Sequence, residues 1–353
     1  MDDPLRLLLT NAVAAAVLAL IAWAASLSVR RASVVHALWL LALVKLVTPP
    51  IAPLPLLPSG SPFAFVSRPG PTVVPMPPPE TRAGPSRRAE ADLVPSSTAR
   101  RALRSGDFGP VTTPPVPNPG RRKIDGRLAT LLALGLGALG ILGLTSRRFA
   151  RFGRLLEDAR PAPAAVVHRA AALAARMGLR RPPEVRVLPA GIPPMLWPAR
   201  GGPLLLLPDR LVPDLHPDEL DALLAHELAH VRRRDHWVRL VEIAATALFW
   251  WYPLTWWARR ALRRAEERCC DEWVLRVLPR SAEAYANGLL KSLAFVADRP
   301  LPSVASGAGP VGDIEARLKE ILMTRPVPPL AAPLRLALAA AVVLGLAVFP
   351  THA

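Results

Sequence analysis

The stretch from Leu223 to Asp235, LLAHELAHVRRRD, places two histidines four residues apart around a glutamate. On a helix, His226 and His230 would lie on one face, one turn apart, so both imidazoles could bind a single ion. Glu227 would lie beside them, close enough to take a proton from a water on that ion. The pattern His-Glu-x-x-His therefore predicts a catalytic Zn²⁺ site, with the two histidines as ligands and Glu227 as general base.

The residues before the motif favour the helix that it requires. Pro217 suits a first helical position, and Asp218 and Glu219 are favourable at the positive amino end of a helix. An apolar stripe follows, formed by Leu220, Leu223, Leu224 and Val231. The alternative is a chance match on a helix that merely carries two histidines. We favour the metal site because a second helix downstream supplies carboxylates.

That second helix is expected from about Thr255 to Val277. A catalytic zinc takes three protein ligands and leaves one position open for water. Glu267 and Asp271, spaced i and i+4, could provide a ligand and a carboxylate that orients a ligand histidine. Glu266 and Cys270 have the same spacing and form a rival pair with a thiolate ligand. Spacing alone does not choose between these pairs, and two acidic residues on a surface helix are a third interpretation.

Long apolar runs indicate that membrane helices carry this site. Of the 353 residues, 51% are hydrophobic. Residues 7–29 carry no charge and could cross ~30 Å of hydrocarbon as a helix. Asp2 and Asp3 argue against a cleaved signal peptide, whose start would be basic. A second, shorter run at residues 33–47 contains His36 and Lys45. We therefore predict two transmembrane helices within residues 1–52.

Two further apolar runs complete a predicted set of about four transmembrane helices. Residues 53–126 are rich in proline, serine and arginine, which predicts a disordered extracytoplasmic loop. A third transmembrane helix is expected at 127–147, where glycines permit close packing. A fourth, from about Leu330 to Phe349, lies within residues 330–353, and only a short tail follows it. Arginines at 30–31 and 147–154 place residues 148–329 in the cytoplasm.

The net charge limits the expected binding partners, and the cysteine content limits the expected cellular compartment. The net charge of +17 comes mostly from arginines that are spread along the chain, and no nucleic-acid-binding motif is present. Membrane lipids are therefore the expected counterpart of this charge, and direct nucleic-acid binding is not expected. The two cysteines are adjacent, at Cys269 and Cys270, which excludes a disulfide framework and fits a reducing compartment.

The segment 148–329 is expected to hold a small sheet packed on the metal helix. Glu184–Leu188 and residues 203–207 have the pattern of strands. If residues 199–206 lie at an edge of the sheet, they could pair with an extended peptide substrate. The alternative is that this strand belongs to the core and has no such role. Residues 237–257 are apolar and rich in tryptophan. A full membrane crossing there would separate His230 from the acidic helix, so we predict a hairpin that dips into the membrane and returns.

The segment from His226 to Asp271 resembles the M56 family of membrane metallopeptidases. The shared features are HELAH followed by Asp235, the patch WYPLTWW, and the acidic helix that ends in Cys270-Asp271. This resemblance implies a cytoplasmic α+β gluzincin-like domain in a mostly α integral membrane protein. It also implies that Glu267 is the third zinc ligand and Asp271 its supporting acid. The implied substrate is a cytoplasmic transcriptional repressor, or the chain itself, and a homodimer is a further expectation.

One departure from the antibiotic-sensing members concerns the carboxyl end. In those members a penicillin-binding-like domain follows the last transmembrane helix, whereas here only residues 350–353 follow it. We therefore expect the protease half of such a transducer, a multi-pass protein of the inner or plasma membrane. Two other functions remain open: an HtpX-like protease that clears damaged membrane proteins, and a non-enzymatic scaffold with structural zinc. Glu227 argues against the scaffold, because a structural site needs no general base.

Overall fold

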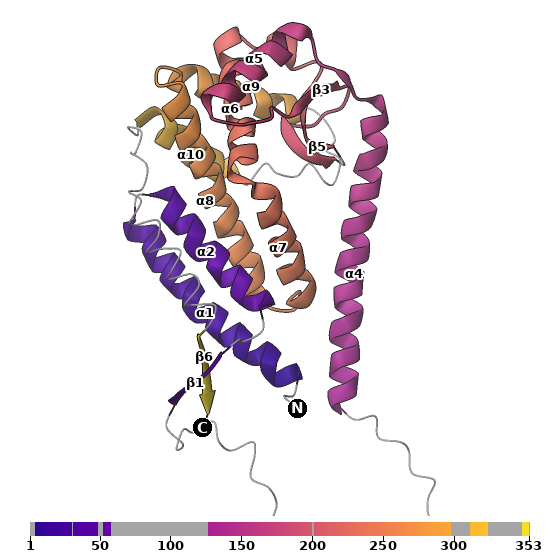
Figure 1. Cartoon of the computed structure of the whole chain (residues 1–353), viewed down its shortest axis with the longest axis vertical. Helices are drawn as coiled ribbons and strands as arrows, with labels where there is room; N and C mark the ends of the chain where they lie inside the picture. Colours follow the sequence, from indigo (N-terminus) through magenta and orange to yellow (C-terminus); the bar gives the residue numbers. More distant parts are fainter. Residues whose placement is uncertain are drawn as a thin grey trace, which may run out of the picture. The chain divides into compact units, whose positions relative to one another are not determined.

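The fold is seen in a computed structural model, which describes residues 4–29, 31–48, 52–57, 126–199, 201–297, 311–323 and 348–352. These residues are mostly helical and include a small mixed sheet, as the sequence predicts (Figure 1). Residues 1–56 and 127–351 belong to one compact unit, which contains the metal-binding motif. A second unit comprises residues 57–126 and 352–353, of which only the ends are described.

Two of the described helices are long and apolar enough to cross a membrane. One extends from Leu8 to Ser28 within α1 (Pro4–Ser28), and the other from Gly126 to Asp158, formed by α4 (Gly126–Leu155) and the short helix η2 (Leu156–Asp158). Both have a hydropathy of 2.1. The second predicted span is the shorter helix α2 (Ala32–Val47), which packs beside α1. Of the fourth predicted span, residues 330–347 lie outside the described residues.

Two short strands that lie far apart in the sequence pair with each other. β1 (Ala52–Leu57) and β6 (Val348–His352) form a two-stranded sheet. β1 occupies the first residues of the predicted disordered loop, and β6 occupies the end of the predicted fourth span. The rest of that loop lies outside the described residues.

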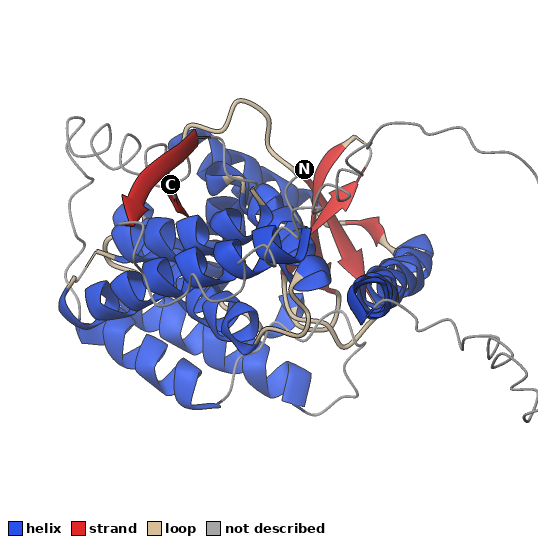
Figure 2. Cartoon of the chain, turned by 90° about the horizontal axis from the view of Figure 1, so that it is seen from below, coloured by secondary structure: helices blue, strands red, loops and turns tan. Residues whose placement is uncertain are grey.

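A four-stranded sheet has the strand order β2-β3-β5-β4. Strands are drawn in red in Figure 2. The strands of this sheet are β2 (Arg160–Pro161), β3 (Glu184–Leu188), β4 (Met195–Ala199) and β5 (Gly202–Pro208). β3 and β5 pair in parallel with Glu184 opposite Leu204, and β4 pairs antiparallel with β5. Both strands predicted from the sequence are present, as β3 and β5.

Residues 199–206 do not form one strand at an edge of the sheet, which was one of the two possibilities that the sequence left open. They contain the end of β4, a turn, and the start of β5, so this segment is a hairpin rather than one strand. β5 lies inside the sheet because β4 covers its second edge, and β4 itself is the edge strand. Sequence analysis missed β4 because MLWPA is short and contains a proline, which demotes a strand prediction.

The metal-binding motif lies on α6 (Pro217–Arg233), which follows the short helix η3 (Val212–Asp214). Glu219 helps to begin α6, because its carboxylate accepts a hydrogen bond from the backbone N–H of His216 at 2.8 Å. One face of α6 packs on α5 (Ala164–Arg176) and the sheet through Leu220, Leu224 and Leu228. The helix ends at Arg234, whose positive φ of 60° turns the chain into the next helix.

Helices α7 (Asp235–Leu248) and α8 (Pro253–Val277) form a hairpin, because the chain reverses direction at residues 249–252. Both arms pack against α1 and α2 in one apolar cluster that includes Ala15, Leu43, Phe249 and Leu262. The reversal brings α8 back to α6 (Figure 1). Glu267 of α8 thereby comes within ion-pair distance of His226 of α6. The entry of this hairpin into a membrane stays a prediction.

Two helices close the metal region from a further side. α9 (Ala282–Ala297) and α10 (Val311–Met323) pack with α6 and α8 around Tyr285 and Ile321, which are both buried. Gly288 allows α9 to approach α6 closely, since a Cβ at this position would lie 3.2 Å from the carbonyl oxygen of Glu219. α9 and α10 therefore lie against both helices that carry the predicted ligands.

Candidate metal centre

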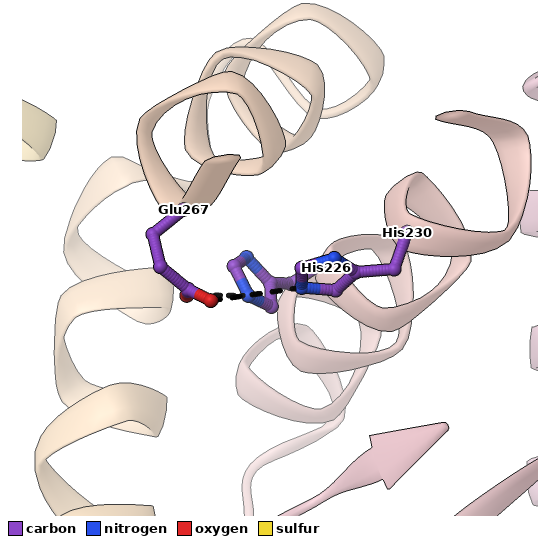
Figure 3. Close-up of side chains that lie close together, drawn as sticks. All are labelled: His226, His230 and Glu267. Atoms are coloured by element: carbon purple, nitrogen blue, oxygen red, sulfur yellow. Dashed lines mark ion pairs between the residues drawn. The ribbon is translucent and has the colours of Figure 1, made fainter. Parts of the chain in front are cut away.

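The three predicted ligands meet between α6 and α8 (Figure 3). Nε2 of His226 lies 3.3 Å from Oε2 of Glu267, and Nε2 of His230 lies 3.9 Å from Oε1 of the same carboxylate. One ligand atom from each of the three residues lies within 4.8 Å of the other two. Two imidazole nitrogens and one carboxylate are the donor set of many catalytic zinc sites.

The second nitrogen of each histidine has its own partner, which directs Nε2 toward Glu267. Nδ1 of His230 lies 2.8 Å from Oδ2 of Asp235. Nδ1 of His226 lies 2.7 Å from the hydroxyl of Tyr285, and that hydroxyl donates to Asp271. Because the hydroxyl proton goes to Asp271, the hydroxyl oxygen must accept from Nδ1–H of His226. Both rings thus have Nδ1 protonated and Nε2 available to a metal, so the donor set fits zinc.

Asp271 lies where the supporting acid was predicted, although a tyrosine comes between it and the histidine. Its Oδ1 is 3.4 Å from Nδ1 of His226, farther than the hydroxyl of Tyr285 is. Asp271 therefore orients His226 chiefly through Tyr285. His230 receives the equivalent support from Asp235, directly and from the first turn of α7.

The rival pair, Glu266 and Cys270, lies on the opposite side of the His230 ring. Oε1 of Glu266 is 3.5 Å from Nδ1 of His230, and Sγ of Cys270 is also 3.5 Å from that nitrogen. Burial raises the pKa of the Cys270 thiol well above its usual value, which disfavours a thiolate. The geometry therefore favours Glu267 as the ligand and gives Glu266 and Cys270 positions behind the ring.

Glu227 is buried, with 8% of its surface exposed. Burial raises the pKa of its carboxyl above the usual value, while the nearby His226 and His230 oppose the rise. A raised carboxyl pKa suits a group that must take a proton and later return it. The position of Glu227 beside the two histidines is therefore compatible with the predicted general base.

His226 is strongly basic when no metal is present. Burial alone would lower its pKa, but the nearby carboxylates of Asp271 and Glu267 raise it to about 10. A proton on Nε2 is therefore favoured between these carboxylates at neutral pH. Zinc would take the place of that proton, since metal ligation needs the neutral imidazole.

Sequence analysis missed two side chains of this centre, Tyr285 on α9 and Arg317 on α10. Nη1 of Arg317 lies 3.0 Å from Oε2 of Glu267, and its Nη2 and Nε contact Asp271 at 2.7 and 3.0 Å. Burial would raise the pKa of Asp271, but Arg317 and the hydrogen bonds around it lower that pKa. No motif marks either residue, and Arg317 is one of 44 basic residues in the chain.

Comparison with known proteins identifies relatives of this chain. The family model described as "BlaR1 peptidase M56" matches residues 6–321. Among curated proteins, the chain is similar to the methicillin resistance mecR1 proteins of Staphylococcus aureus and Staphylococcus epidermidis, with 26% identity over 88 residues. The matched segment is 25% of this chain and spans only 15% of the length of those relatives.

Proposed function

The chain belongs to the BlaR1 peptidase M56 family, and from this premise we propose that it is an integral membrane zinc endopeptidase. The observation that carries the proposal is the meeting of His226 and His230 from α6 with Glu267 from α8. Each histidine is supported through Nδ1, as in zinc enzymes that need fixed imidazoles. Three protein ligands leave a position for water, which a catalytic site requires.

The chemistry we propose is hydrolysis of a peptide bond. Zinc bound by His226, His230 and Glu267 would supply Lewis acidity, which lowers the pKa of water to about 7. Glu227 takes one proton from the attacking water, whose oxygen forms a bond to the carbonyl carbon of the substrate. The bond from that carbon to nitrogen then breaks, and Glu227 returns the proton to the leaving amine.

The remaining residues of the centre keep the ligands in place. Asp235 and Tyr285 accept the Nδ1 protons of the two histidines, so neither ring can rotate without losing a hydrogen bond. Arg317 pairs with the carboxylate of Glu267 and offsets the negative charge that the buried acids bring together. Such charge balance is needed because an unpaired buried carboxylate is costly.

We further propose regulated proteolysis of a cytoplasmic repressor, or of the chain itself, at the inner face of the plasma or inner membrane. Family membership, the apolar helices α1 and α4, and the arginines that flank them support this placement. The apolar surface of α1 and α4 fits membrane lipid, since Leu9, Val17 and Leu136 are more than half exposed. A homodimer is compatible with this arrangement and is part of the proposal.

The test compares purified full-length protein with its Glu227→Gln variant. N-terminal sequencing should identify fragments of a co-expressed candidate repressor, or of the chain, that form with the wild type. Loss of the general base should slow their formation by about 10²- to 10⁴-fold. Glu283→Gln provides a matched control, because Glu283 is an exposed residue in the first turn of α9.

Two results would change the proposal. Full cleavage by the Glu227→Gln variant, with zinc bound, would exclude Glu227 as the general base and so exclude this mechanism. Failure of the zinc-bound wild type to form any fragments would favour the structural-zinc scaffold. Cleavage of many unfolded membrane proteins at unrelated sequences, with no preferred repressor, would favour the quality-control protease.

A further inference from the structure

A second group of buried polar side chains lies behind the metal ligand His230. His36 of α2, Asp235 of α7 and Glu266 of α8 each place one donor atom within 4.8 Å of the other two. Their exposed fractions are 9%, 4% and 0%, so all three are at least nine-tenths buried. Three helices far apart in the sequence therefore converge at this point, and one of them is a predicted membrane span.

Each of these side chains has one polar atom without a hydrogen-bond partner in the described protein: Nε2 of His36, Oδ1 of Asp235 and Oε2 of Glu266. The other carboxylate oxygens are occupied. Oδ2 of Asp235 contacts His230 and Arg233, and Oε1 of Glu266 accepts from Arg239 at 2.6 Å. Buried polar atoms are almost always satisfied. Three unpartnered atoms on side chains that approach one another within 4.8 Å therefore indicate a shared polar occupant.

The charge balance around these three side chains distinguishes a metal ion from a water molecule as the occupant. Arg233 and Arg239 already balance the carboxylates of Asp235 and Glu266. A second divalent cation would add two uncompensated positive charges in a buried region beside the first metal, at a large electrostatic cost. A water molecule is neutral, and a buried water typically makes about three hydrogen bonds. The cluster therefore suits one water.

We propose that His36 is a positioning residue for the metal ligand His230. It acts through one buried water that joins its Nε2 to Asp235 and Glu266, and Asp235 in turn holds Nδ1 of His230. The inference rests on the proposed function, in which His230 binds zinc. Its consequence is that a predicted membrane helix, α2, supports the metal centre directly.

Contacts along α2 give this support a mechanical basis. The backbone N–H of Ala32 lies 3.4 Å from Oε1 of Glu272, one turn before His36 on α2. Farther along, the rings of Trp39 and Trp257 meet edge to face, with centroids 4.8 Å apart. α2 is thus bound to α8 on both sides of His36. A displacement of α2 relative to α8 would move His36 away from Asp235 and loosen His230.

The test measures zinc affinity of the detergent-extracted full chain by competition with a chromogenic chelator. Loss of a side chain that hydrogen-bonds to a ligand histidine typically weakens metal binding by 10- to 100-fold. His36 reaches His230 only through a water and Asp235, so His36→Leu should weaken zinc binding by about tenfold, the low end of that range. His36→Gln keeps a polar group near the position of Nε2 and should restore wild-type affinity. Leu43→Ala is the control, because Leu43 is a buried residue of α2 in the apolar cluster. It should lower the melting temperature without changing zinc affinity.

The outcomes separate this inference from the proposed function. If the wild type binds no zinc, the proposed function fails. If the wild type binds zinc and His36→Leu binds it equally well, the positioning role is wrong. It is also wrong if His36→Gln is as weak as His36→Leu. A second zinc per wild-type chain that disappears in His36→Leu would overturn water as the occupant. Should His36→Leu not fold, His36→Ala takes its place with the same expected loss.

Discussion

Tyr285→Phe removes a single oxygen atom and so tests whether the Tyr285 hydroxyl holds His226 in place. The hydroxyl of Tyr285 accepts from Nδ1 of His226 at 2.7 Å and donates to Asp271. The ring packs with Val274, Leu275 and Ile321, and phenylalanine would keep this packing. The substitution therefore removes hydrogen bonds without creating a large cavity.

The expected losses of stability and zinc affinity depend on which acceptor replaces the hydroxyl of Tyr285. After the change, the nearest acceptor for Nδ1–H of His226 is Oδ1 of Asp271, which is 3.4 Å away. Hydrogen bonds to charged groups contribute about 1.5–3 kcal/mol each, so the metal-free protein should lose stability of this order. Zinc affinity should fall by about tenfold, the low end of the range for such partners, because Asp271 can still move toward the histidine.

The assay is a chelator competition in detergent, together with thermal unfolding with and without EDTA. The chain has only two tyrosines, so Tyr252→Phe is a natural control. The Tyr252 hydroxyl donates to the backbone oxygen of Ala12 at 3.1 Å, in the apolar helices. Tyr252→Phe should bind zinc as the wild type does. Equal zinc affinity of Tyr285→Phe and Tyr252→Phe would refute the argument that Tyr285 holds His226.

Three further predictions concern the same centre. Glu267→Gln should weaken zinc binding by about 100-fold or more in the chelator assay, because it removes the anionic ligand. Glu266→Gln should weaken zinc binding less. The reverse order of the two variants would favour Glu266 and Cys270 as the ligand pair. Arg317→Gln should destabilise the protein by about 3 kcal/mol, because the buried carboxylate of Asp271 and the partly exposed carboxylate of Glu267 lose their cation. An unchanged melting temperature would contradict the pairing. The pKa of His226 is raised to about 10 in the metal-free protein, so zinc must displace a proton below that pH. Apparent zinc affinity should therefore rise by about tenfold per pH unit through neutrality, and a flat profile from isothermal titration would contradict it.

Much of the site could be predicted because His226, Glu227 and His230 lie close together in the sequence, on one helix. His226 and His230 share a face of α6 wherever that helix lies in the fold, since the helical period places residues four apart together. The helix itself was predictable from its first-turn residues and apolar stripe. The strands β3 and β5 were also found from local pattern, while β4 was missed and the position of β5 within the sheet was left open.

The choice between Glu266 and Glu267 was not available from spacing, because neighbouring helical residues point about 100° apart and only packing decides which one faces the metal. The packing of α8 on α6 turns Glu267 toward Nε2 of both histidines and leaves Glu266 with Arg239. The resemblance to the family pointed to Glu267, and the tertiary structure supplies the physical reason.

The sequence by itself determined which side chains the centre can combine locally, since residue types and helical spacing set two imidazoles beside a carboxylate. Only the tertiary structure decided what surrounds these side chains. Tyr285 lies 59 residues from His226, and Arg317 lies 46 residues from Asp271. His36 approaches the metal helix from a different apolar helix altogether. These contacts depend on how whole helices pack, and no local pattern in the chain encodes them.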